Sequence, residues 1–117
     1  MRSGSNVDLH ETARYLLQYR TERHRICAIT TYKGRITAVG LNSYVKTHPE
    51  QKRLAVRVGH AEREFLHAEI SALLKAKKAD AIHVFRLGKD GTWRNAKPCA
   101  ICELAIKERY INEVNHT

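Results

Sequence analysis

The stretch HAEISALLKAKKADAIHVFRL, residues 67–87, decides the fold because its apolar pattern changes from helical to strand-like halfway along. In its first half, Ile70, Leu73 and Leu74 recur at the spacing of one face of a helix. Its second half, residues 81–87, is a short and mostly apolar run that is typical of a strand. A helix that leads into a strand in this way predicts a layered α/β fold.

The same alternation of helix and strand continues on both sides of this stretch. The other segments are an amphipathic helix over residues 7–20, a hairpin over 25–42 that turns at Lys33–Gly34, an Asp-Gly turn within 88–95, a helix over 99–110 and a weak strand over 111–117. Residues 43–65 mix proline, glycine and many charges, and they predict a long basic loop with some short structure. We therefore expect one α/β domain over residues 1–117, with a parallel or mixed central sheet covered by helices.

The charge of the chain favours an anionic partner. Its 117 residues include 21 Lys and Arg against 12 Asp and Glu, which gives a net charge of +9 at pH 7. Such a charge attracts nucleotides, nucleic acid or, with less support, acidic lipid, although a basic solvated surface is an equally simple explanation. The sequence begins without an apolar leader and contains no run of about 18 apolar residues, so we expect a cytoplasmic protein with no membrane partner.

Three residues form a candidate zinc site. Cys99 and Cys102 are three apart at the start of a predicted helix, where the helix dipole favours thiolate over thiol. In a reducing compartment, this Cys-x-x-C spacing indicates metal or redox chemistry rather than a disulfide framework. A catalytic zinc takes three protein ligands and keeps one position for water, so His67 with the two thiolates makes a suitable set. Glu69, two residues from His67, is then placed to carry protons for that water.

The tripeptide His-Ala-Glu occurs twice, beginning at His60 and at His67, and only one copy can serve this site. On one helix the two histidines would lie about 10 Å apart along the axis, whereas a shared zinc needs both within about 2 Å. The second copy runs into an apolar helix, while the first lies in a charged stretch. We therefore assign the proton carrier to Glu69 and expect Glu62 to be a solvated surface residue.

With His67-Ala68-Glu69 followed by Pro98-Cys99-Ala100-Ile101-Cys102, the chain resembles the zinc-dependent cytidine deaminase-like superfamily over about residues 24–117. The resemblance implies a three-layer α/β fold with a mixed central sheet. It also implies that His67, Cys99 and Cys102 bind Zn²⁺ and that Glu69 shuttles protons. In this superfamily a zinc-activated water attacks an amino-bearing ring carbon and expels ammonia, leaving a carbonyl.

The resemblance also implies substrate contacts and an assembly state. It assigns a sugar contact to Asn42, at the end of a predicted strand, and a substrate contact to Ala68 of the motif. Relatives often assemble through their helices, so a homo-oligomer is expected. Many relatives continue beyond the strand written here as INEVNHT with a further helix and strand, which implies an open sheet edge or an oligomer interface in this chain.

A few further residues are candidates without a motif. If the basic loop forms a lip over the site, Lys46 is placed to bind a phosphate and His48 to close over substrate, although a solvated charged loop explains both nearly as well. Trp93 follows the Asp-Gly turn, and stacking on a base and packing at the sheet edge are equally favoured for it. Cys27 and His83 are expected to be packed or hydrogen-bonded within strands.

Three functions stay open at this point. The first is a zinc hydrolase that deaminates a cytosine nucleoside or nucleotide to the uracil form with release of ammonia. The second is an editing deaminase that acts on cytosine or adenine in single-stranded DNA or RNA, which the charge of +9 favours. The third is a non-catalytic zinc module that binds nucleic acid, but it gives Glu69 no role. With a histidine, His67, as the first zinc ligand, the chain is similar to the branches that act on deoxycytidylate, on transfer RNA or on polynucleotides. This feature does not distinguish among the three branches.

Overall fold

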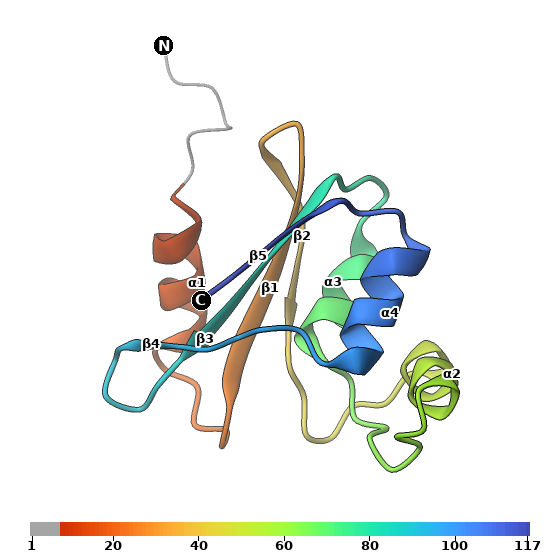
Figure 1. The fold of residues 1–117 in the computed structure, drawn as a ribbon. Coiled ribbons are helices and arrows are strands. Elements are labelled where there is room, and N and C mark those ends of the chain that lie inside the picture. Colours follow the sequence, from red (N-terminus) through yellow and green to blue (C-terminus); the bar gives the residue numbers. More distant parts are fainter. Residues whose placement is uncertain (1–7) are drawn as a thin grey trace.

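The computed structural model describes residues 8–117. The five strands in this range form one sheet. β1 (Arg25–Tyr32) runs antiparallel to β2 (Arg35–Leu41) on one side and to β3 (Ala81–Leu87) on the other. The outer edge of β3 pairs in parallel with β5 (Glu113–His116) and antiparallel with the short β4 (Trp93–Arg94). The sheet is therefore mixed, as the sequence predicts (Figure 1).

Helices cover both faces of this sheet (Figure 1). α1 (Leu9–Leu17) packs on one face, and α3 (Ala68–Lys75) and α4 (Ala100–Glu108) pack on the other, with α2 (Pro49–Arg57) beside α4. These three layers confirm the expected α/β fold. No helix in the part of the chain that the structure describes is long and apolar enough to cross a membrane.

The alternation of side chains along each strand divides the core into two parts. The strand residues that face α3 and α4 include Ile26, Ala28, Ile82 and Val84. Those that face α1 include Cys27, Ile29, Phe85 and Leu87. The even-numbered residues of β1 and β3 therefore lie on the α3 and α4 side, and the odd-numbered ones lie on the α1 side.

Two local features hold β2 in its place. Lys33 and Gly34 join β1 to β2 with φ angles of 51° and 80°, and positive φ at both positions is what a tight two-residue hairpin requires. Further along β2, a Cβ atom at Gly40 would lie 2.3 Å from the Ala68 carbonyl oxygen. Only glycine therefore allows α3, and His67 just before it, to lie this close to the sheet.

The largest departure from the sequence prediction is α2, a nine-residue helix inside the stretch expected to be a loop. The His48 ring accepts a hydrogen bond from the Glu50 backbone N–H, and Pro49 lies in the first turn, where its missing N–H is harmless. The buried side of the helix consists of Gln51, Leu54 and Ala55. The prediction of a loop with some short structure missed this helix, because the many charges of the segment obscure a short apolar stripe.

The short β4 lies where only a turn was predicted, and the remaining elements match the sequence prediction to within a few residues. α1 occupies the middle of the expected 7–20 helix, and Val7 lies outside the described residues. Cys27 is fully buried in β1, as expected. His83 hydrogen-bonds through one ring nitrogen with Thr31 and through the other with Asn115, at 3.0 and 3.2 Å, so its expected place within the sheet is also confirmed.

Candidate metal centre

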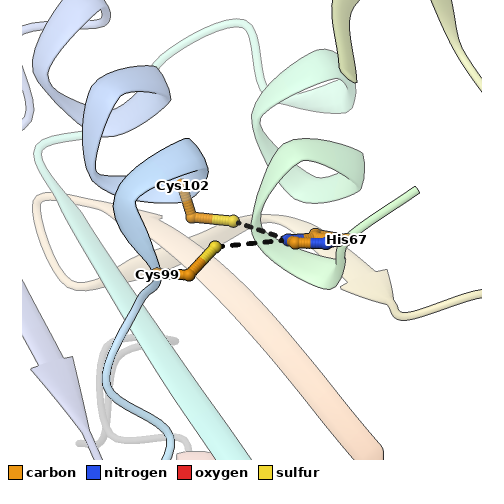
Figure 2. A group of neighbouring side chains, drawn as sticks. All are labelled: His67, Cys99 and Cys102. Carbon is orange, nitrogen blue, oxygen red and sulfur yellow. Dashed lines mark hydrogen bonds between the residues drawn. The ribbon is translucent and has the colours of Figure 1, made fainter. Parts of the chain in front are cut away.

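His67, Cys99 and Cys102 meet where α3 and α4 begin (Figure 2). The Nδ1 atom of His67 lies 3.3 Å from the Cys102 sulfur and 3.6 Å from the Cys99 sulfur. All three ligand atoms lie within 4.8 Å of one another. The fold therefore brings together the two motifs that the sequence analysis singled out.

These distances fit a tetrahedral zinc ion. With Zn–S bonds of about 2.3 Å and a Zn–N bond of about 2.1 Å, neighbouring ligand atoms of a tetrahedron lie roughly 3.6–3.8 Å apart. The two nitrogen–sulfur separations are already close to that value, so little side-chain movement is needed to bind the metal. Three protein ligands leave a fourth position for water or substrate, which is the arrangement of a catalytic rather than a structural zinc site.

Both helices begin at a ligand residue. His67 is the N-cap of α3 and Cys99 is the N-cap of α4, and neither side chain caps its own helix. The exposed N–H groups and the positive ends of both helix dipoles therefore converge on the cluster, where they stabilise negatively charged sulfur. The sequence predicts Cys99 inside the first turn, and the structure has it one residue before Ala100, the first helical residue.

A buried amide holds His67 in position, and the sequence analysis missed it. Gln51 of α2 has no exposed surface. Its Oε1 accepts a hydrogen bond from the His67 backbone N–H at 3.1 Å, and its Nε2 donates one to the Arg63 carbonyl at 3.1 Å. The signal that could have revealed Gln51 is its position three and four residues before the buried Leu54 and Ala55, on the same helical stripe.

The two thiols differ in acidity. A hydrogen bond with Cys102, assisted by the His67 ring, lowers the pKa of Cys99 to about 3. The same hydrogen bond, together with burial, raises the pKa of Cys102 well above its usual range. Burial disfavours a charge on the His67 ring, but the neighbouring Cys99 outweighs this effect and raises the pKa of His67. Without a metal the thiol pair therefore keeps one proton, which a divalent cation displaces when it takes thiolate ligands.

Glu69 lies in the first turn of α3, buried beside the cluster with only 6% of its surface exposed. Burial raises the pKa of its carboxyl group above the usual range. A carboxyl group shifted in this direction is suited to take and return a proton near neutral pH. The other copy of the tripeptide is different, because the Glu62 side chain is 70% exposed and lies outside the cluster.

Four residues are expected to contact substrate besides Trp93. Ala68 follows His67 directly, and Asn42, Lys46 and His48 lie in or beside the segment 43–46, which hydrogen-bonds with Leu66. Ala68 is buried as the first residue of α3. Lys46 has an exposed side chain, and its carbonyl accepts a hydrogen bond from the N–H of Leu66. His48 caps α2 and is exposed. Asn42 is buried and hydrogen-bonds with its side chain to the backbone at the start of β1, so its contact with a sugar stays a prediction.

Trp93 lies on the opposite face of the sheet and is not brought to the cluster. Its ring centroid is 5.6 Å from those of Phe85 and His10, and the Arg14 guanidinium carbon lies 4.9 Å above it. These partners belong to the part of the core that α1 covers. Of the two interpretations left open, the structure supports packing at the sheet edge rather than stacking on a base.

Comparison with known proteins agrees with this site. The family model described as the cytidine and deoxycytidylate deaminase zinc-binding region matches residues 6–117, a range that includes all three ligand residues and Glu69. A search of the curated proteins finds no match to this chain. The prediction of zinc as the cofactor is confirmed, because the family binds zinc and the structure positions a His-Cys-Cys group to hold it.

Proposed function

The chain belongs to the family of the cytidine and deoxycytidylate deaminase zinc-binding region, and on this premise we propose that it hydrolyses a cytosine nucleoside or nucleotide to the uracil form. The observation that carries the proposal is the buried carboxyl group of Glu69 beside a three-ligand cluster. A structural zinc site has four protein ligands and no need of a buried acid. A hydrolytic site needs both the open position and the acid.

The reaction divides between the metal and the protein. His67, Cys99 and Cys102 would hold the zinc ion, which would lower the pKa of a bound water to about 7 and so supply a nucleophile at neutral pH. The water oxygen forms a bond to C4 of cytosine, the bond from C4 to the amino group breaks, and ammonia leaves. Glu69 takes a proton from the water and passes it to the ring nitrogen, and the second water proton reaches the departing amino group.

An editing deaminase of single-stranded DNA or RNA is the second candidate, and the net charge of +9 is what favours it. Each phosphate neutralised by Lys or Arg releases counterions, so binding of a strand should weaken steeply as salt is raised. Binding of a single nucleotide involves few phosphates and should change little over the same range of salt. The oligomeric state, the extent of the domain over residues 1–117 and the cytoplasmic location stay predictions.

The experiment that tests the proposed function is ammonia release by zinc-loaded protein over a panel of substrates. The panel consists of cytidine, deoxycytidine, their monophosphates and triphosphates, adenosine, and single-stranded DNA and RNA. Glu69→Ala is assayed beside the parent, and Glu62→Ala is its matched control, because it removes the same group from the exposed copy of the tripeptide.

We expect the parent and Glu62→Ala to release ammonia from at least one monomeric cytosine substrate, and Glu69→Ala to retain zinc but release none. Turnover of strands alone, with binding that falls steeply with salt, would replace the first candidate by the editing deaminase. If no substrate in the panel is turned over, the proposal of a cytosine or adenine deaminase fails, and a non-catalytic zinc module becomes the better account.

A further inference from the structure

Within residues 8–117, the guanidinium group of Arg86 forms no ion pair with a carboxylate. Arg86, near the end of β3, is half-buried, and its Nη2 lies 3.0 Å from Nδ1 of His24, which is also half-buried. Residues two apart along a strand lie on the same face of the sheet. Arg86 is two residues after Val84 and His24 is two before Ile26, and both of these apolar residues face α3 and α4. The pair therefore lies on the face of the sheet that α3 and α4 cover, and these are the helices that begin at the cluster.

Hydrogen bonds connect this pair to the segment that carries His67. The His24 carbonyl accepts a hydrogen bond from the Asn42 side chain at 2.8 Å. The next residue, Ser43, donates its backbone N–H to the carbonyl of Leu66 at 3.0 Å. Leu66 immediately precedes His67, so these hydrogen bonds place the start of β1, with His24, near the start of α3.

A second set of hydrogen bonds connects the pair to the segment that carries Cys99. The backbone N–H of Arg86 donates to Oγ1 of Thr117 at 3.1 Å, and the carbonyl of Thr117 accepts from Ala96 at 2.8 Å. Ala96 precedes Cys99 by three residues. The backbones of Arg86 and His24 are therefore linked by hydrogen bonds to the two segments that supply the ligands.

The charge of Arg86 is not neutralised within the described part of the chain. The ion pairs of residues 8–117 engage Arg20, Arg53, Arg57, Arg63 and Arg94 but not Arg86. Burial, assisted by the charges of Arg86 and Arg23, lowers the pKa of His24, which keeps its ring neutral and able to accept a hydrogen bond from Arg86. A half-buried guanidinium with a neutral partner retains its full attraction for an anion.

We propose that Arg86 binds the phosphate of a phosphorylated cytosine substrate, and that His24 positions its guanidinium group for this contact. The inference rests on the proposed function, because the phosphate is the anionic group that a cytosine nucleotide carries. Guanidinium presents a planar fork of N–H donors that matches phosphate oxygens, and the hydrogen bond to His24 occupies only one of the five donors. The preferred substrate class is thus the nucleotide rather than the free nucleoside.

The test measures binding rather than turnover, by calorimetry with zinc-loaded protein in which Glu69→Gln prevents hydrolysis of the ligand, and this protein serves as the parent for the variants below. The ligands are deoxycytidine, deoxycytidine monophosphate and a short single-stranded oligonucleotide with one internal cytosine. The variants are Arg86→Gln and Arg86→Lys, with Arg35→Gln as the matched control, because Arg35 is exposed at the opposite end of the sheet and loses the same charge. His24→Gln, which keeps a hydrogen-bond acceptor, and His24→Leu, which does not, test the positioning role.

In the parent we expect the monophosphate to bind about 10- to 100-fold more tightly than deoxycytidine. Arg86→Gln should remove this ratio while leaving the affinity for deoxycytidine unchanged, Arg86→Lys should keep part of it, and Arg35→Gln should keep all of it. His24→Leu should reduce the ratio, and His24→Gln should restore it. A loss confined to the oligonucleotide would identify a strand as the source of the phosphate.

An unchanged ratio in Arg86→Gln, or no preference for phosphate in the parent, would overturn the inference. These results are independent of whether ammonia is released. If the protein prefers the phosphorylated ligand through Arg86 but turns over no substrate, this inference is upheld and the proposed function is refuted. If the protein turns over a substrate but shows no such preference, the proposed function is upheld and this inference is refuted.

Discussion

Replacing Gln51 by Met should loosen His67 and weaken zinc binding, although Gln51 supplies no metal ligand. Met has a similar volume and is apolar, so the packing of α2 should survive. The two hydrogen bonds of the amide, to the His67 N–H and the Arg63 carbonyl, are lost. Because Gln51 is fully buried, water is poorly placed to replace them.

The size of the effect follows from these two contacts. A buried polar group that loses its partner costs about 1–3 kcal/mol, so two groups, partly offset by the apolar side chain, cost about 2–4 kcal/mol. For a domain of this size that corresponds to a decrease in Tm of roughly 8–16 °C. Loss of a group that orients a ligand residue typically weakens metal binding by about 10- to 100-fold.

Two assays measure these effects. Circular dichroism gives the Tm of each protein with zinc and with chelator, and competition with a chromophoric chelator gives the zinc affinity. Gln18→Met is the matched control, because Gln18 is exposed at the end of α1 and the substitution is the same. A zinc affinity for Gln51→Met within a factor of two of the parent would refute the reasoning that Gln51 positions His67, whatever the Tm.

Three further predictions concern the thiols, the approach of α3 to the sheet, and Trp93. In protein stripped of zinc, iodoacetamide should modify Cys99 even at pH 5, as detected by mass spectrometry, because its pKa of about 3 leaves it a thiolate. Cys27 is buried and has a pKa of about 12, so it should stay unmodified even at pH 8. Zinc should protect Cys99, and equal labelling of both cysteines at pH 5 would contradict this. Gly40→Ala should destabilise the fold by about 3 kcal/mol or more, because its Cβ would lie 2.3 Å from one backbone atom of α3 and 2.5 Å from another. The loss should appear as a lower midpoint of denaturation in urea. An unchanged midpoint would show that α3 can move away from the sheet freely. Trp93→Ala should lower the free energy of unfolding by about 2–3 kcal/mol, because the packing of the ring under α1 is lost, and it should leave the affinity for zinc and nucleotide unchanged. A selective loss of nucleotide binding would instead support stacking of Trp93 on a base.

The ligand set could be predicted from the sequence because its order and spacing are local. His67 and Glu69 are two residues apart at a helix start, and Cys99 and Cys102 are three apart at another, so each pair is arranged by one helix alone. The strand β3 could also be predicted, since a short and mostly apolar run is typical of a strand.

The features that escaped the sequence analysis depend on contacts between distant segments. Arg86 and His24 are 62 residues apart and meet because β1 and β3 pair in one particular register. Trp93 lies on the α1 side because of the pairing of a two-residue strand, which no sequence period specifies. Gln51 had a detectable position in its helix, but its two hydrogen-bond partners lie in the loop that follows.

The most direct test of the central claim is to measure uracil product and zinc content for the parent and for Glu69→Gln, with a cytosine nucleotide as substrate. We expect one zinc per chain in both proteins and one ammonia released per uracil formed by the parent. Turnover by Glu69→Gln should fall by at least about 100-fold, since general acid–base catalysis contributes about that much or more. Turnover by Glu69→Gln at the rate of the parent, with zinc still bound, would contradict the account, because the buried carboxyl group would then have no part in the reaction.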